Sequence, residues 1–139
     1  PEAEPPAPEP GDRPRILHLE DDPDIRRIVT ELTRAHADCV PARTLAAARS
    51  WLQKFAFDVV LLDLDLGEQE ESGWNLMRQL RAMPQRPAVI VYSANELPTE
   101  DCAAIEAALL KSQATEAELL QAIQRFLPPQ AAQVALSAA

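Results

Sequence analysis

Acidic, hydroxyl and ammonium side chains follow apolar runs at four places in this sequence. Glu20 and Asp21 follow the run at residues 16–19, and Asp63 follows the run at residues 59–62. Ser93 and Lys111 stand at the ends of two further runs. Carboxylates grouped without His or Cys ligands form a hard, oxygen-rich site that suits Mg²⁺ or Mn²⁺ better than Zn²⁺. A hydroxyl and a lysine neutralise charge on phosphoryl oxygens, and a carboxylate can act as a nucleophile to give an acyl phosphate. These residue types predict Mg²⁺-dependent phosphoryl transfer, provided that they meet in space.

The pattern of strands and helices explains how they would meet. Residues 59–62 are apolar on both faces, which is typical of a strand buried in a parallel sheet beneath helices. Strands are expected at residues 15–19, 39–41, 58–63, 88–92 and 109–111, and segments with helical periodicity separate them. Parallel strands with right-handed crossovers place all their C-terminal ends on one rim, where open α/β sheets bind ligands. A lone Asp at a strand end is most often simply solvated, so the prediction depends on the whole set.

Local signals mark the expected helix starts. Pro23 suits the first turn of one helix, Thr44 is expected to cap the next, and Thr115 with Glu118 forms a capping-box pattern. A helix is also expected from Gly73 to Pro84, and residues 98–108 have room for one short helix. Pro41 indicates that the strand around residues 39–41 lies at a sheet edge. Three other residues, His18, Trp51 and Phe55, are interpreted as packed core residues and not as a ligand site.

Composition limits the functional classes. The chain has 139 residues, enough for one domain, and its net charge of -9 argues against nucleic-acid binding through a basic surface. Cys39 and Cys102 have no metal-ligand spacing, which favours a reducing compartment. With no apolar run of about 20 residues and no signal-peptide pattern, a cytoplasmic protein without a membrane span is expected. We expect residues 1–14 to be a Pro-rich flexible tether, residues 15–127 to form the domain and residues 128–139 to be an Ala-rich tail. The chain lacks an initiator Met, and the sequence leaves open whether it is a piece of a longer protein.

Four motifs follow one another along residues 15–127. They are Ile16-Leu17-His18-Leu19-Glu20-Asp21-Asp22-Pro23, Val59-Val60-Leu61-Leu62-Asp63-Leu64-Asp65, Val89-Ile90-Val91-Tyr92-Ser93-Ala94 and Leu109-Leu110-Lys111. Each is weak alone, but four in register are specific. In this order and spacing they closely resemble the receiver domain of bacterial two-component response regulators. The resemblance implies a flavodoxin-like (CheY-like), doubly wound, five-stranded parallel sheet with strand order 2-1-3-4-5.

The resemblance also implies roles for individual residues. Asp63 would accept a phosphoryl group from the phosphohistidine of a sensor histidine kinase or a phosphotransfer protein. Ser93 would bond a phosphoryl oxygen, and Lys111 would pair with the phosphate. Receivers promote their own phosphorylation and dephosphorylation, so this would not be a conventional enzyme. Its output would pass to a downstream protein or a fused domain, with a homodimer as a possible state and no direct nucleic-acid binding. The implied ligands of Mg²⁺ or Mn²⁺ are Glu20, Asp21, Asp63 and the backbone carbonyl of Asp65.

Several positions depart from the family pattern. Gly67 replaces a proline, in a loop that is about two residues longer than usual and acidic. The segment between Ser93 and Lys111 is short, which predicts a trimmed or irregular fourth helix. Ala108 stands where an aromatic residue is usual, and Ser112 where a proline is usual. We therefore expect a phosphorylatable receiver whose output surface differs from the standard one.

Two alternative functions also fit parts of the sequence. Leu62-Asp63-Leu64-Asp65 also fits the Asp-x-Asp motif of haloacid-dehalogenase-type phosphatases. That family needs an acidic metal-binding motif after the lysine, where this chain has only Glu116 and Glu118 on a predicted helix. The other alternative is a pseudo-receiver, which would have the same fold without phosphorylation and act as a docking or dimerisation module.

Overall fold

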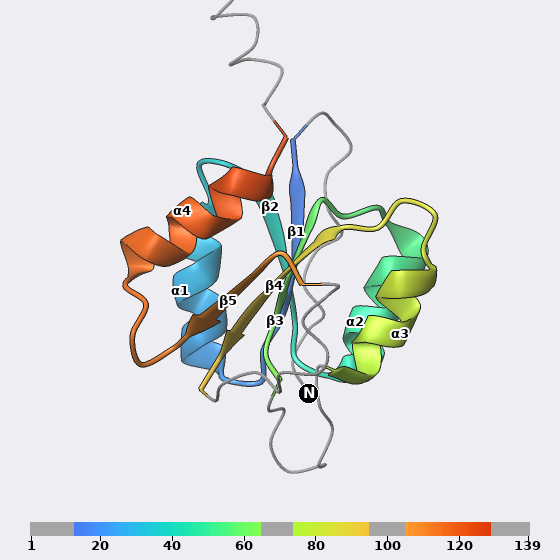
Figure 1. The fold of residues 1–139 in the computed structure, drawn as a ribbon, viewed down its shortest axis with the longest axis horizontal. Helices are drawn as coiled ribbons and strands as arrows, with labels where there is room; N and C mark the ends of the chain where they lie inside the picture. Colours follow the sequence, from blue (N-terminus) through green and yellow to red (C-terminus); the bar gives the residue numbers. More distant parts are fainter. Residues whose placement is uncertain (1–12, 65–73, 95–104, 129–139) are drawn as a thin grey trace, which may run out of the picture.

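A computed structural model describes residues 13–64, 74–94 and 105–128 of the chain. Strands and helices alternate through most of it (Figure 1). The elements are β1 (Arg15–Leu19), α1 (Pro23–Thr33), β2 (Asp38–Ala42), α2 (Leu45–Lys54), β3 (Val59–Leu62), α3 (Trp74–Ala82), β4 (Ala88–Ser93), β5 (Ala107–Leu110) and α4 (Glu116–Phe126).

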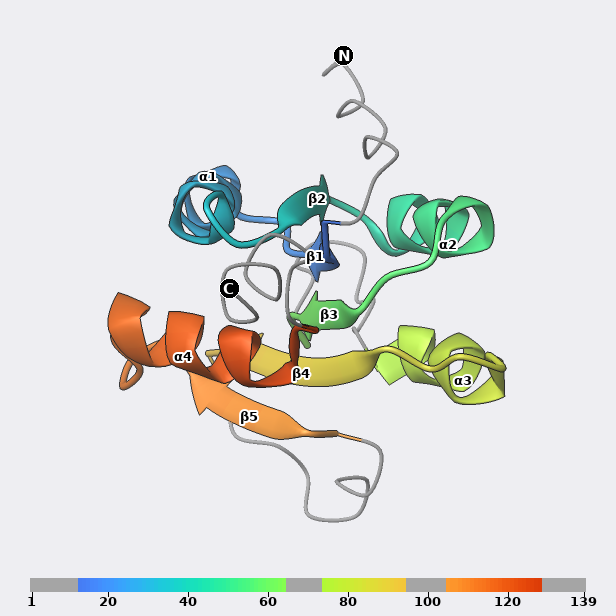
Figure 2. The ribbon, with the colours of Figure 1, turned by 90° about the horizontal axis from the view of Figure 1, so that it is seen from above.

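The five strands form one parallel sheet in the order β2-β1-β3-β4-β5. Helices α1 and α4 cover one face, and α2 and α3 cover the other (Figure 2). This is the doubly wound, flavodoxin-like arrangement predicted from the sequence, and the strand order is confirmed. Because β1 and β3 are neighbours and β4 and β5 follow outward, the C-terminal ends of these four parallel strands lie side by side.

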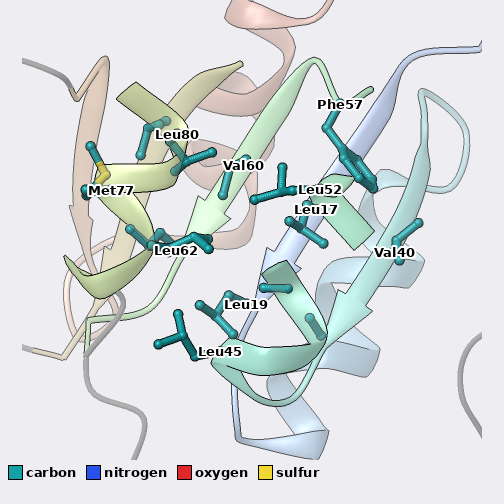
Figure 3. Packing of buried hydrophobic residues seen from close by; sticks show 14 residues of the cluster. Leu17, Leu19, Val40, Leu45, Leu52, Phe57, Val60, Leu62, Met77 and Leu80 are labelled. Atoms are coloured by element: carbon teal, nitrogen blue, oxygen red, sulfur yellow. The ribbon is translucent and has the colours of Figure 1, made fainter. Parts of the chain in front are cut away.

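Strand alternation divides the apolar residues between two core layers. Leu17 and Leu19 of β1 pack under α2 and α3, as Figure 3 shows, whereas Ile16 packs under α1 and α4. The four residues of β3 are all fully buried because helices cover both faces of this central strand. The continuous apolar run in the sequence is therefore explained by two-sided burial.

The helix starts agree with the capping signals. The Thr44 side chain accepts a hydrogen bond from the Ala47 amide, and both hydrogen bonds of the Thr115–Glu118 capping box form. Pro23 occupies the first turn of α1, after the N-cap residue Asp22. No helix within the described ranges is both long enough and apolar enough to cross a membrane.

The sheet edges differ from the sequence prediction mainly in extent. β2, which contains Pro41, is an edge strand as predicted, and it begins already at Asp38. β5 begins at Ala107 and residues 105–106 are not helical, so the short helix predicted over residues 98–108 does not extend to its expected end. The Glu106 backbone explains the difference, because its N–H donates to the Val89 carbonyl oxygen at 2.9 Å and extends the sheet hydrogen bonding. Residues 95–104, where the altered fourth helix was predicted, lie outside the described residues, as do Gly67, residues 1–12 and residues 129–139.

His18 is a buried core residue, as predicted from the sequence. Its exposed fraction is 1%, and strand alternation places it on the same face of β1 as Ile16. Its Nδ1 atom has no hydrogen-bond partner among the described residues. Burial, reinforced by the positive charges of Lys111 and Arg26, lowers the pKa of His18 to about 3. The imidazole is therefore neutral throughout the physiological pH range.

The depressed pKa of His18 predicts an acid-sensitive stability. Unfolding frees the imidazole to bind a proton below its ordinary pKa of 6.5, so its contribution is complete above pH 6.5 and falls as the pH drops toward 3. Between pH 7.5 and pH 5, we expect wild type to lose about 2 kcal/mol of unfolding free energy relative to His18→Leu. Urea denaturation of both proteins at the two pH values measures this difference. Parallel changes in the two proteins would contradict the buried, neutral imidazole.

Candidate functional site

Backbone hydrogen bonds continue the sheet beyond the strand ends and fix the exit points of the chain. The Glu20 N–H donates to the Ala42 carbonyl, and the Asp63 N–H donates to the Leu19 carbonyl, at 2.9 and 3.0 Å. The Lys111 N–H donates to the carbonyl of Ser93 at 2.9 Å. These bonds hold the residues after β1, β3 and β5 at one rim, where the sequence analysis placed them.

A lysine joins the two buried carboxylates at this rim. Lys111 Nζ lies 2.7 Å from Glu20 Oε1 and 3.2 Å from Asp63 Oδ2. The side chains of Glu20 and Asp63 are 1% and 3% exposed, and that of Lys111 is 18% exposed. The ammonium group therefore reaches the site from its more open side, and it partly neutralises two anions that have little access to water.

The burial of these groups changes their acidities. Burial is the main cause that raises the pKa of Glu20 to about 7; the hydrogen bond from Lys111 opposes this change, and the charge of Asp63 adds to it. Burial alone would lower the pKa of Lys111, but the hydrogen bond and charge of Glu20, followed by the effects of Asp63, raise it. The site thus favours a cation strongly and is short of positive charge.

Three carboxylates at the rim form a group that can hold a metal ion. Glu20, Asp21 and Asp63 each offer an oxygen, and these oxygens lie within 4.8 Å of one another. Oxygens on opposite sides of an octahedral Mg²⁺ ion are about 4.2 Å apart, because each Mg–O bond is about 2.1 Å. Neighbouring oxygens around the same ion are about 3.0 Å apart, so small side-chain movements would bring the three oxygens into the range of about 3 to 4.2 Å that one ion requires. Asp65, whose carbonyl was predicted as a further ligand, lies outside the described residues.

Glu20 also has two contacts with residues at the start of α1. The Asp22 N–H donates to Glu20 Oε2 at 3.2 Å, and the Arg26 guanidinium donates to the backbone carbonyl of Glu20 at 2.8 Å. The sequence analysis missed Arg26, since the helical spacing of α1 gives no sign that one arginine reaches back to β1. The Tyr92 ring was also missed as part of the site, and its centroid is 5.9 Å from Lys111 Nζ, within cation–π range.

The remaining predicted residues occupy the expected strand ends. Ser93 is the last residue of β4 and is fully buried, and its carbonyl accepts the Lys111 amide bond described above. Ala108 of β5 is exposed and pairs in register with Val91. The structure therefore brings Glu20, Asp21, Asp63 and Lys111 into one group, with Ser93 at the same rim.

Comparison with known proteins identifies the family and the fold of the chain. The sequence profile described as "Response regulator receiver domain" matches residues 16–124. No curated protein matched the chain.

Solved structures with the same fold cover most of the chain. A CheY-like receiver domain from Methylobacillus flagellatus is 24% identical, with a TM-score of 0.71 over 82% of this chain and 98% of its own. A sensor protein from Polaromonas sp. JS666 is 28% identical, with a TM-score of 0.70 over 82% of this chain and 95% of its own. The response regulator TrrA from Thermotoga maritima, solved in complex with Mg²⁺ and BeF, is 23% identical, with a TM-score of 0.70 over 82% and 99% of the two chains.

The profile spans well over half of the chain, and the strand order agrees with that of the solved receivers. The match favours this family over the haloacid-dehalogenase-type phosphatases, which the Asp-x-Asp motif alone had suggested. This chain belongs to the response regulator receiver domain family of two-component signal transduction.

Proposed function

We propose that this receiver accepts a phosphoryl group on Asp63 from the phosphohistidine of a sensor histidine kinase or a phosphotransfer protein. The observation that carries the proposal is the buried Asp63 carboxylate, which lies beside Glu20 and Asp21 and in contact with Lys111. This combination supplies a nucleophile, a cation-binding acidic pair and a fixed ammonium group at a single strand end. The reaction class that uses all three is phosphoryl transfer.

The chemical step follows from the roles of these side chains. An oxygen of the Asp63 carboxylate forms a bond to phosphorus while the bond from phosphorus to the donor's imidazole nitrogen breaks. The electron pair of that bond stays on the imidazole, which leaves neutral or takes a proton from solvent. Lys111 is close enough to Asp63 to pair with an oxygen of the transferred group, and we assign the Ser93 hydroxyl to another oxygen. Hydrolysis of the acyl phosphate returns Asp63 to its carboxylate form.

We assign Mg²⁺, or Mn²⁺ in its place, to Glu20, Asp21, Asp63 and the carbonyl of Asp65. The donor set supports this assignment, because all the ligands are hard oxygen atoms and two of the carboxylates are buried. When bound, the ion supplies charge neutralisation for the phosphoryl oxygens. Lys111 alone balances only part of the negative charge at the rim, which leaves a need for a second cation.

A second candidate is a docking or dimerisation module that is not phosphorylated. Ala108 favours it, since this exposed residue on β5 provides no aromatic ring to respond to a change at Ser93. The intact group of Glu20, Asp21, Asp63 and Lys111 favours phosphorylation instead. In either case, we propose a cytoplasmic domain that signals through a partner protein or a fused domain.

Phosphorylation of Asp63 can be tested with a small phosphodonor. Incubation with acetyl phosphate and Mg²⁺ should add one phosphoryl group per chain, detected by intact-protein mass spectrometry, and the adduct should be stable in acid and labile in base. Asp63→Asn should remove the labelling completely because it removes the nucleophile. Asp22→Asn is the matched control, because Asn also caps a helix and residue 22 is not an assigned ligand. Labelling that persists in Asp63→Asn, or its absence from wild type, would favour the docking module.

Metal binding can be tested separately from phosphorylation. Titration of the protein with MgCl₂ in a calorimeter should show one site, and Asp21→Asn should weaken that site about tenfold or more because it removes a charged ligand. Asp21 is exposed, so this change leaves the core intact. Asp22→Asn should bind Mg²⁺ as wild type does. Equal Mg²⁺ affinities for wild type and Asp21→Asn would rule out the assigned acidic pair.

A further inference from the structure

Two neighbouring aromatic rings lie between two cations at the C-terminal end of α2, next to the start of β1. Lys54 Nζ lies 6.0 Å from the Trp51 ring centroid, the Trp51 and Phe55 centroids are 5.6 Å apart, and the Arg15 guanidinium carbon lies 5.6 Å from the Phe55 centroid. Lys54 is exposed, and the other three side chains are partly exposed. We call these four residues the aromatic–cation strip. The sequence analysis assigned the two rings to the core, but they lie at its margin.

The strip occupies the side of α2 that faces away from α3. The Arg49 guanidinium donates to the Asn75 carbonyl at 3.1 Å, which identifies the side of α2 that contacts α3. Trp51 follows Arg49 by two residues, which places it about 200° around the helix axis. Ala48 and Leu52 point into the core between these two sides. The strip therefore lies on the side of α2 toward the β2 edge of the sheet (Figure 2).

We propose that residues 1–12 of this chain dock on the aromatic–cation strip. This segment contains five prolines and four carboxylates and has no basic residue. Proline-rich segments favour the polyproline II conformation, and partly exposed aromatic rings are the surfaces that bind it, as in recognition of Pro-x-x-Pro motifs. Pro5-Pro6-Ala7-Pro8 has that pattern. Its acidic neighbours, Glu4 and Glu9, complement the positive charges of the strip.

The point where the segment joins the domain makes this docking sterically accessible. Arg13 is fixed by a 3.0 Å ion pair with Asp38 and by a 2.6 Å hydrogen bond to the Arg34 carbonyl. Arg15, only two residues later, already belongs to the strip. Twelve residues in polyproline II extend about 37 Å, whereas the ten residues of α2 span about 15 Å. The segment is therefore long enough to return along the whole strip from its attachment at β1.

Proline chemistry favours the strip over the neighbouring sheet edge. A proline has no N–H with which to extend a sheet, so a segment with prolines at positions 5, 6, 8 and 10 cannot pair regularly with β2. Ring contacts and ion pairs remain as its means of attachment. The docked segment would lie near the end of the domain where β1 begins, away from Asp63, which follows the C-terminal end of β3. Docking is therefore compatible with access of a phosphodonor to Asp63.

Paramagnetic relaxation in NMR tests this proposal on the full chain. A nitroxide is attached at Ala3→Cys in a Cys39→Ser, Cys102→Ser background, and the Trp51 indole N–H signal is compared before and after the label is reduced. The indole signal should lose most of its intensity while the label is active, and amide signals from α4 should retain theirs. Added NaCl at 1 M should restore part of the indole intensity, because the screening length falls to about 3 Å.

Two variants confined to the segment serve as controls that cannot unfold the domain core. Pro5→Gly/Pro6→Gly/Pro8→Gly removes the conformational preference, and Glu2→Gln/Glu4→Gln/Glu9→Gln removes three charges; each should restore much of the indole signal. An indole signal that the label leaves intact, or that both variants leave equally broadened, would overturn the proposal. Broadening in a mixture of isotope-labelled unmodified chains and unlabelled nitroxide chains would overturn it as well, since that result assigns the contact to a second copy.

Discussion

The confinement of two carboxylates with little access to water is the constraint on which this structure depends. Glu20 and Asp63 are almost fully buried at the ends of adjacent strands, and burial of an anion is costly unless it is paired. Lys111 lies within ion-pair distance of both, so one positive charge serves two negative ones. Burial is the main cause that raises the pKa of Glu20, and the charge of Asp63 adds to it. A site with this excess of negative charge favours the binding of a further cation.

The sheet order is what makes such confinement possible. β1 and β3 are neighbours, so Glu20 and Asp63 follow adjacent strands at the same rim. Lys111 reaches this rim from β5, which is the edge strand on the other side of β4. The core layer beneath the site also matters for the charge balance at the rim. His18, one side-chain layer below Glu20 on the same face of β1, stays neutral because it is buried and close to two cations. A neutral imidazole fills the volume there without changing the charge balance of the rim.

Much of this arrangement could be predicted from the sequence, because parallel strands collect their C-terminal ends at one rim. The run at residues 59–62 signalled a strand buried on both faces, and its position before Asp63 located the site. β5 was harder to delimit, since Ala107 and Ala108 suit a helix as readily as a strand. Pairing with β4, which local sequence does not encode, decides in favour of the strand. The contact of Arg26 with the Glu20 carbonyl could not be predicted from the sequence either, because it depends on how α1 packs against β1.

The length of the side chain at position 20 explains why the imbalance is tolerated. Both carboxylate oxygens of Glu20 are engaged: Oε1 pairs with Lys111, and Oε2 accepts from the Asp22 amide. Aspartate has one methylene fewer, so its carboxylate at the same backbone position would lie farther from Lys111 Nζ, which is 2.7 Å from Glu20 Oε1. The backbone cannot move to compensate, because the Glu20 amide is bonded to Ala42 and its carbonyl to Arg26. Glutamate here links the lysine that follows β5 directly to the end of the first strand, and Lys111 shares its ammonium group between Glu20 and Asp63.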